Sequence, residues 1–238
     1  MAMIADNIGA VRQRIAAACL AAGRSVQSIT LLAVSKTVGV QAVREACAAG
    51  EFQFGENYIQ EGVEKITALA DLRDSVQWHM IGPVQANKTR LIAEHFDWVH
   101  SVDRLRVAQR LSEQRPLGRK PLQVCLQVNI SGETSKGGVA PSEVAALARA
   151  VKGLPGLRLR GLMSIPEPLP DSAAQHRPHR ALRELLGSLN ASGFCLDTLS
   201  MGMTADLEAA IAEGATMVRV GTAIFGARPG HLPSAALA

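Results

Sequence analysis

The sequence predicts an α/β protein: a single (β/α)8 TIM barrel preceded by an extra N-terminal helix. Strand-like and helix-like segments alternate along the chain, which implies a parallel sheet. Eight such units of about 25 residues each fit the size of an eight-stranded barrel. With 238 residues and 47% hydrophobic content, the chain can bury one large core. We therefore expect one domain over residues 1–238, with a helix in 1–24, the barrel in 29–228 and a short tail in 229–238.

The hydrophobic spacing predicts the individual elements. The first segment is an amphipathic helix that ends at Gly23, because apolar residues recur in it every three or four positions. Strands are expected near residues 30–35, 52–54, 77–81, 97–100, 122–129, 157–163, 196–200 and 216–220. Helices are expected near residues 39–49, 56–70, 85–95, 103–114, 141–152, 172–191, 204–213 and 222–226.

Composition excludes several classes of protein. No apolar stretch is long enough to span a membrane, and the N-terminus lacks the pattern of an export signal, so we expect a cytoplasmic protein. The net charge is +4, but basic residues are scattered among acids and only 3% of residues are aromatic, which argues against nucleic-acid binding. The four cysteines lack metal-ligand spacing, so we expect buried free thiols and no metal site. The expected oligomeric state is a monomer.

The first strand-like run, residues 29–37, ends in a single lysine, Lys36. Barrel active sites lie at the carboxyl ends of the strands, and a partly desolvated amine there can form a Schiff base. The alternative is a solvated lysine, which is the usual state of lysines at strand ends. Lys36 is the first candidate for the site.

The last strand-like run offers an anion site. Residues 217–228 contain a short apolar strand, then Gly221 and Thr222 at the start of a helical segment. Unpaired backbone N–H groups and the helix dipole favour a phosphate at such a position. Ser200, at the end of the preceding strand, adds a hydroxyl group. The chain therefore offers an aldehyde trap at one end and a phosphate cradle at the other.

Three further polar residues have two interpretations each. Arg219 should share a strand face with Met217 and Gly221, where it either contacts a ligand or forms a buried ion pair. Asn57 follows the second strand and could simply cap a helix. His79 in the third strand is more often a hydrogen-bonded core residue than a catalyst.

Several motifs in the right order give the chain a specific resemblance to the pyridoxal phosphate (PLP) homeostasis proteins, which resemble the barrel domain of fold-type III alanine racemases. The resemblance covers nearly the whole chain. Its motifs are Ala33-Val34-Ser35-Lys36-Thr37, Phe54-Gly55-Glu56-Asn57-Tyr58, Trp78-His79-Met80-Ile81-Gly82, Asn87-Lys88, Ser135-Lys136-Gly137, Arg160-Gly161-Leu162-Met163, Leu199-Ser200-Met201-Gly202-Met203 and residues 217–228.

The resemblance implies the cofactor and its contacts. Lys36 would hold pyridoxal 5'-phosphate as an internal aldimine, and Arg219 would face the pyridine nitrogen. The phosphate would be bound by Ser200, Gly221 and Thr222, and the surroundings of the ring would be lined by Asn57 and Met201. Two departures from the family pattern are a loose segment at residues 204–207 and an unusual loop from His176 to His179.

Three functions compete. The first is a non-catalytic PLP carrier in vitamin B6 homeostasis, with apo PLP-dependent enzymes as acceptors. The second is a PLP-dependent amino-acid racemase, but the related racemases place a second base in an additional domain, and this chain ends shortly after Phe225. Its single tyrosine, Tyr58, follows the second strand. The third is a Schiff-base aldolase without a cofactor. The carrier is favoured.

A polar, glycine-flanked segment at residues 131–138 follows the fifth strand and should lie on the same face as Lys36. It is either a solvated loop or the carrier of a second amine. Lys136 is the candidate for that amine, accepting the aldehyde during PLP transfer.

Overall fold

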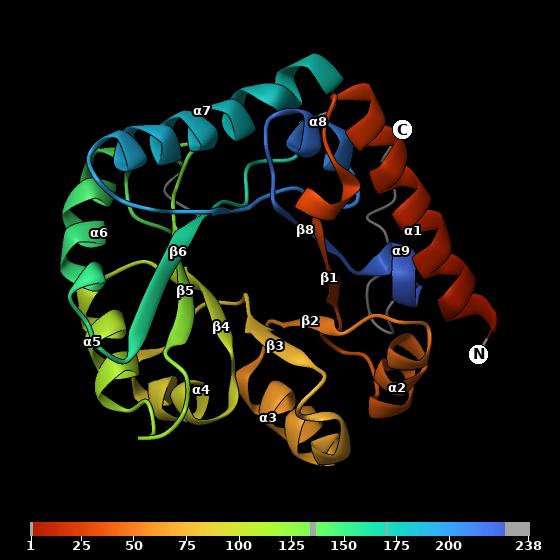
Figure 1. The fold of residues 1–238 in the computed structure, drawn as a ribbon, viewed down its shortest axis with the longest axis horizontal. Helices are drawn as coiled ribbons and strands as arrows, with labels where there is room; N and C mark the ends of the chain where they lie inside the picture. Colours follow the sequence, from red (N-terminus) through yellow and green to blue (C-terminus); the bar gives the residue numbers. More distant parts are fainter. Residues whose placement is uncertain (1, 134–136, 170, 227–238) are drawn as a thin grey trace, which may run out of the picture.

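A computed structural model describes residues 2–133, 137–169 and 171–226. Its parallel strands close into a barrel in sequence order, each pairing with the next and the last with the first (Figure 1). This confirms the predicted fold class. The strands are β1 (Thr30–Val34), β2 (Gln53–Glu56), β3 (Gln77–Met80), β4 (Trp98–Val102), β5 (Leu122–Gln127), β6 (Leu157–Met163), β7 (Thr198–Ser200) and β8 (Met217–Val220).

A helix follows each strand and covers the outside of the barrel (Figure 1). The α-helices of the described residues are α1 (Ala2–Ala21), α2 (Val40–Ala48), α3 (Ile59–Ala68), α4 (Thr89–His95), α5 (Leu105–Glu113), α6 (Val144–Lys152), α7 (Ser172–Ala191), α8 (Leu207–Ala212) and α9 (Thr222–Phe225). Short 3-10 turns precede or link some of them: η1 (Val26–Ser28), η2 (Ala70–Leu72), η3 (Ala86–Lys88) and η4 (Pro141–Glu143). Within these residues no helix is both long and apolar enough to cross a bilayer.

The extra helix α1 lies along one side of the barrel beside α8 and α9 (Figure 1). The guanidinium of Arg14 donates to the Glu208 carboxylate at 2.8 Å, and the amide of Asn7 donates to the carbonyl of Ile224 at 2.9 Å. The apolar face of α1, including Ile8, Val11 and Ile15, is buried in the main core. This helix therefore supports the last two βα units.

The pleat of the strands separates two kinds of interior. In β1, Leu31 and Ala33 pack in the large core between sheet and helices, whereas Leu32 and Val34 form a small apolar cluster with Ile81 and Met217. Because successive side chains of a strand point to opposite faces, the second set fills the barrel itself. The same alternation directs His79, His100, Ser200 and Arg219 inward, and all four are buried.

Two sequence-based expectations are wrong. His176 to His179, expected as a loop although the predicted helix 172–191 spans them, lie inside α7, which contains Pro178. The helix persists there because His176 bonds Glu213 and His179 bonds Asp206, so tertiary contacts offset the backbone bond that proline removes. Cys19, Cys47 and Cys125 are buried free thiols as expected, but Cys195 is exposed. It lies in the connection between α7 and β7.

Candidate functional site

A cavity of about 370 Å³ opens at the carboxyl ends of the strands, and five of the seven predicted site residues line it. Lys36 comes from the turn after β1 and Asn57 from the end of β2, while Arg219, Gly221 and Thr222 come from β8 and the start of α9. The first and last βα units thus meet across one cavity, because β1 pairs with β8. The remaining lining residues are Val34, Ile81, Ile165, Met203, Thr204 and Ala205.

The structure does not bring the other two, Ser200 and Met201, to the cavity wall. Met201 follows Ser200 by one residue and therefore points outward, where it is buried in the core between sheet and helices. Ser200 points inward but lies below the cavity, beside Met217 in the barrel register. Its hydroxyl is already hydrogen bonded to Arg219 and His100. From this loop, Met203 and Thr204 line the cavity instead, and the sequence pattern did not single them out as site residues.

The turn that carries Lys36 is held from below by a buried ion network. Thr37 has a φ of 61°, a left-handed conformation that is unusual for a β-branched residue. Its N–H donates to the Glu61 carboxylate at 2.5 Å. The ammonium of Lys65 donates to that same oxygen at 2.6 Å and to the carbonyl of Ser35 at 2.5 Å. These contacts hold the backbone on both sides of Lys36 in one conformation.

Glu56 completes this network at the end of β2. One carboxylate oxygen accepts bonds from the Ser35 hydroxyl at 2.6 Å and from Lys65 at 2.8 Å, while the other is buried without a partner in the described structure. Burial raises the pKa of Glu56, and the adjacent Lys65 charge opposes that rise. Lys65 is thus the counter-ion for both Glu56 and Glu61 beneath the Lys36 turn.

Arg219 is 4% exposed and fixed by neutral acceptors. Its Nη1 donates to the Ser200 carbonyl at 2.6 Å and to the Ser200 hydroxyl at 2.8 Å, and its Nη2 donates to the Ser164 carbonyl at 2.8 Å. Burial lowers the pKa of Arg219 to about 10, so it stays charged at pH 7. Three of its five N–H groups are used in this way, and no carboxylate within the described residues forms an ion pair with it. A charged group held by neutral oxygens alone at a cavity wall is suited to an electron-rich ligand atom.

A chain of hydrogen bonds runs from Arg219 through the barrel interior. The Ser200 hydroxyl lies 2.8 Å from Nδ1 of His100, whose Nε2 lies 2.9 Å from Nδ1 of His79. Nε2 of His79 lies 2.9 Å from the Gln53 side-chain oxygen, which can only accept. Every link therefore points the same way: Arg219 donates to Ser200, Ser200 to His100, His100 to His79 and His79 to Gln53. This chain orients Ser200 and leaves its oxygen as an acceptor for Arg219.

Both histidines of this chain are neutral. Burial lowers the pKa of His79 to about 3, and it lowers that of His100 well below its ordinary value, with the charge of Arg219 adding to the effect. The interpretation of His79 as a hydrogen-bonded core residue agrees with this position. His100 was not singled out in the sequence, because its partners are 21 and 100 residues away.

Asn57 is not a helix cap, because α3 begins after Tyr58 and has no side-chain cap. Its backbone packs against Gly82, where an added Cβ would lie 2.1 Å from the Asn57 carbonyl oxygen. Only glycine at position 82 allows this approach. The close contact places Asn57 on the cavity wall beside Ile81.

After β8, the strand next to β1, α9 begins at Thr222 directly after Gly221. The N–H groups of Ile224 and Phe225 bond the Gly221 carbonyl, whereas the first helical N–H groups have no acceptor inside the helix. Gly221 and Thr222 line the same cavity as Lys36. The start of α9 is therefore a suitable anion cradle.

Part of the cavity wall is fixed by α7. His179 is fully buried and its Nε2 lies 3.0 Å from the Asp206 carboxylate, which also accepts from the N–H of Met203 at 2.6 Å. Burial acts to raise the pKa of Asp206, but these hydrogen bonds and nearby positive charge leave it below its ordinary value. The backbone at Met203 is thus held beside the cavity. Lys136 lies outside the described residues.

The fold and the cavity define a TIM barrel with an amine after its first strand and an anion cradle after its last. The family model for the N-terminal domain of alanine racemase matches residues 4–229. The chain belongs to this family and, within it, to the pyridoxal phosphate homeostasis proteins.

Two relatives and one solved structure document this membership. The chain is 63% identical over 234 residues to a protein of Pseudomonas aeruginosa named pyridoxal phosphate homeostasis protein, covering 98% of this chain and all of the relative. A protein of the same name from Escherichia coli is 54% identical over 226 residues, or 94% of this chain and 97% of the relative. The structure of PipY from Synechococcus elongatus with PLP bound is 36% identical, with a TM-score of 0.81 over 94% of this chain and 100% of that chain.

Proposed function

We propose that this protein binds pyridoxal 5'-phosphate covalently through Lys36 and acts as a carrier in intracellular PLP homeostasis, without substantial catalysis. The observation that carries the proposal is the single cavity that holds Lys36, Arg219 and the start of α9 together. Those three features match the aldehyde, the pyridine nitrogen and the phosphate of PLP. A solved relative contains PLP, and close relatives are named for its homeostasis.

Each cavity residue has a part in holding the cofactor. The Nζ of Lys36 would form the covalent bond to the aldehyde carbon, and Arg219 would donate to the pyridine nitrogen. Gly221 and Thr222 would bind the phosphate, with Asn57 beside the ring. Ser200 and Met201, both buried behind the wall, would act indirectly: Ser200 by orienting Arg219, Met201 by packing. We treat residues 1–238 as one domain built around this site.

Bound PLP supplies an electron sink that stabilises carbanions, and the residues around it decide how far that chemistry goes. A permanent cation facing the pyridine nitrogen keeps the nitrogen unprotonated and weakens the sink. The described residues that line the cavity include no ionisable side chain besides Lys36 and Arg219. A second base on the opposite face of the cofactor, which a racemase requires, is therefore missing from this set. The arrangement favours a carrier that delivers PLP to apo-enzymes.

The test is a spectrum followed by chemical trapping. The purified protein should be yellow, and borohydride reduction should place a pyridoxyl group on the peptide that contains Lys36. Lys36→Ala should lose both signals, whereas Lys152→Ala, which removes an exposed lysine of α6 that donates to the Gly193 carbonyl, should keep them. A label on another peptide, with full colour in Lys36→Ala, would show that the site is wrong.

A separate assay addresses the absence of catalysis. We expect no transamination, decarboxylation or alanine racemisation above the rate of free PLP. Robust turnover by the purified protein, abolished in Lys36→Ala, would show that it is an enzyme.

A further inference from the structure

A second cavity, of about 420 Å³, lies at the opposite end of the barrel. It is formed by the amino ends of β3 to β6 and by the connection between α5 and β5, far along each strand from the Lys36 cavity. Nothing in the proposed function uses it. Its charged lining residues are five basic ones, Arg73, Arg115, Arg119, Lys120 and Arg160, and the two acids Asp74 and Asp97.

This cavity has an excess of positive charge. Five basic side chains line it, against two carboxylates. Behind the wall, Asp197 is 2.8 Å from Arg160 and neutralises it. Two positive charges remain uncompensated.

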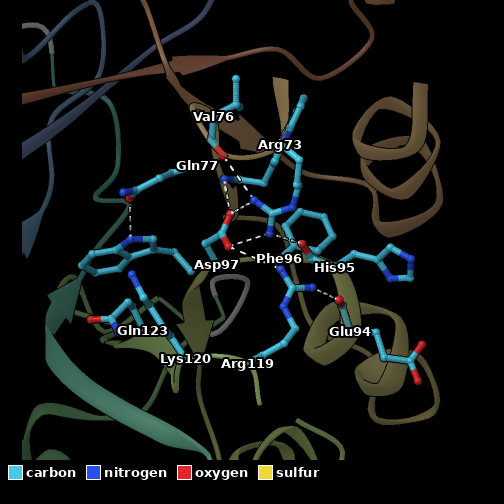
Figure 2. Close-up of polar contacts among 12 residues, drawn as sticks. Arg73, Val76, Gln77, Glu94, His95, Phe96, Asp97, Arg119, Lys120 and Gln123 are labelled. Carbon is cyan, nitrogen blue, oxygen red and sulfur yellow. Dashed lines mark hydrogen bonds and ion pairs between the residues drawn. The ribbon is translucent and has the colours of Figure 1, made fainter. Parts of the chain in front are cut away.

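Two of the cations are held mainly by structural partners. Arg73 binds the Asp97 carboxylate at 2.6 and 3.0 Å and also donates to the carbonyls of Val76 and His95 (Figure 2). Arg115 donates to three backbone carbonyls, those of Ala93, Phe96 and Lys120. These arginines tie the segments around the cavity together and use four and three of their five N–H groups, respectively, to do so.

Arg119 and Lys120 are in a different situation. Arg119 uses one nitrogen on the Glu94 carbonyl, but its other terminal nitrogen stays 3.8 Å from Asp97, beyond hydrogen-bond distance. Lys120 is exposed, and the part of the chain that the structure describes offers no hydrogen bond or ion pair to its ammonium. Figure 2 shows Arg119 beside Asp97, which already binds Arg73.

The arginines around this cavity repel one another, and this repulsion contributes to lowering the pKa values of Arg115 and Arg119. Burial lowers the pKa of Arg115 to about 10, with the charge of Arg119 adding to the effect. Burial also lowers the pKa of Arg119, assisted by Arg73. Asp97 opposes both shifts but does not cancel them. An anion bound between these groups would relieve the repulsion.

The shape and the aromatic content narrow the class of ligand. Trp98 is 7% exposed, stacks on His79 at 5.3 Å and carries the Arg160 guanidinium 4.9 Å from its ring centroid, so neither ring face is free to stack on a base. The remaining wall is polar, with the side-chain amides of Gln77 and Gln123. A concave site of this size suits a small molecule better than an extended nucleic-acid strand.

We propose that this cavity is a second binding site, for a compact dianion: the phosphate monoester of a small polar metabolite, held by Arg119 and Lys120. The two phosphate charges match the two uncompensated positive charges. The amide of Gln77, whose oxygen accepts from Trp98 at 3.3 Å, keeps its N–H groups for hydroxyl groups of the ligand. The site is independent of PLP binding at Lys36.

The test is calorimetric titration of the protein with glycerol 3-phosphate at low ionic strength, with glycerol as the uncharged comparator. Saturable binding of the phosphate compound alone is expected, and Arg119→Ala and Lys120→Ala should each weaken it about tenfold. Arg106→Ala removes one exposed positive charge on α5, outside the cavity, and should leave affinity unchanged. Lys120→Arg should retain binding.

Two further titrations distinguish this cavity from the Lys36 cavity and from a nucleic-acid surface. Thr222→Val changes the Lys36 cavity and should leave the glycerol 3-phosphate titration unchanged. If Thr222→Val abolishes binding while Lys120→Ala does not, the probe occupies the Lys36 cavity and the proposal is wrong. No saturable binding by the native protein also overturns it. A single-stranded RNA oligonucleotide that displaces the probe at equal phosphate concentration would show that the cavity recognises a nucleic-acid backbone instead.

Discussion

The two ends of the barrel carry positive charge in different ways. At the carboxyl end, Lys36 and Arg219 are the charged groups among the described cavity residues, and Arg219 is buried and held by neutral acceptors. At the amino end, five cations share two carboxylates around a partly exposed hollow. Few oriented groups suit a site that forms a covalent bond, whereas many screened charges suit reversible anion binding. The residues that support the two ends should therefore differ in their importance for stability and for binding, and this difference can be tested.

The largest expected effect concerns the buried network beneath Lys36. Lys65→Met should destabilise the protein by about 3–5 kcal/mol, because it leaves Glu56 and Glu61 without their counter-ion. Arg44→Met, which breaks an exposed pair with Asp71, is the control and should change little. Urea unfolding of both variants measures the difference. Equal stabilities of the two variants would show that the network does not support the carboxyl end of the barrel.

The second prediction addresses the phosphate cradle at α9. Pyridoxal should bind roughly a hundredfold more weakly than PLP, since it lacks the charge-assisted hydrogen bonds to Thr222 and the first helical N–H groups. Thr222→Val should weaken PLP binding but not pyridoxal binding. Spectroscopic titrations at constant ionic strength compare the two ligands. Equal affinities would mean that the cradle is assigned to the wrong residues.

The third prediction concerns the histidine chain that runs between the two ends. The folded pKa of His79 is about 3 and that of His100 is also well below its ordinary value, so on acidification the unfolded state binds protons that the folded state does not. The stability that these neutral histidines contribute is therefore fully present above about pH 6.5 and is lost as the pH falls below it. At pH 5.5 His79 should cost about 1.4 kcal/mol relative to pH 7.5, and His100 acts in the same direction.

Unfolding of the native protein and of His79→Gln at these two pH values measures this cost. The variant should lose less stability on acidification than the native protein does. His95→Gln, at the C-terminal end of α4, is the control and should behave like the native protein. A native stability that stays constant from pH 7.5 to pH 5.5 would contradict the buried neutral histidines.

The smallest expected effect is at the second cavity, at the amino ends of the strands. Lys120→Ala should change the free energy of unfolding by less than about 0.5 kcal/mol, because its exposed ammonium makes no contact within the described residues that folding would lose. A larger destabilisation would mean that Lys120 supports the fold rather than a ligand. The same unfolding experiment therefore compares how much Lys65 at one end of the barrel and Lys120 at the other contribute to stability.

Much of the site around Lys36 could be predicted from local sequence patterns. The alternation of strands and helices predicted the barrel, and the end of the first apolar run placed Lys36 correctly after β1. Strand periodicity put Arg219 on the inward face with Met217. The element ends differ by only a few residues, as at β7, which begins at Thr198 rather than 196.

The structure differs from the sequence-based picture where side-chain direction and distant partners matter. Met201 and Ser200 are neighbours in sequence, but the pleat sends one to the outer core and leaves the other below the cavity, so Met203 takes the place at the wall. The His176 to His179 segment contains Pro178, which removes a backbone hydrogen bond from the helix predicted over residues 172–191. Contacts to Asp206 and Glu213, from the next βα unit, keep it helical.

The sequence by itself determined the fold class, the family and the chemical identity of the residues at the strand ends, because hydrophobic period and motif order are local properties. Only the closed barrel decided which of those residues meet. It joins β1 to β8 so that Lys36 and Thr222 line one cavity, links His100 to Ser200 across 100 residues, and brings Arg73 and Arg119 to Asp97, with Lys120 in the same cavity lining. The physical reason is that charges and hydrogen-bond partners act through distance in space, which the chain order does not encode until the strands have paired.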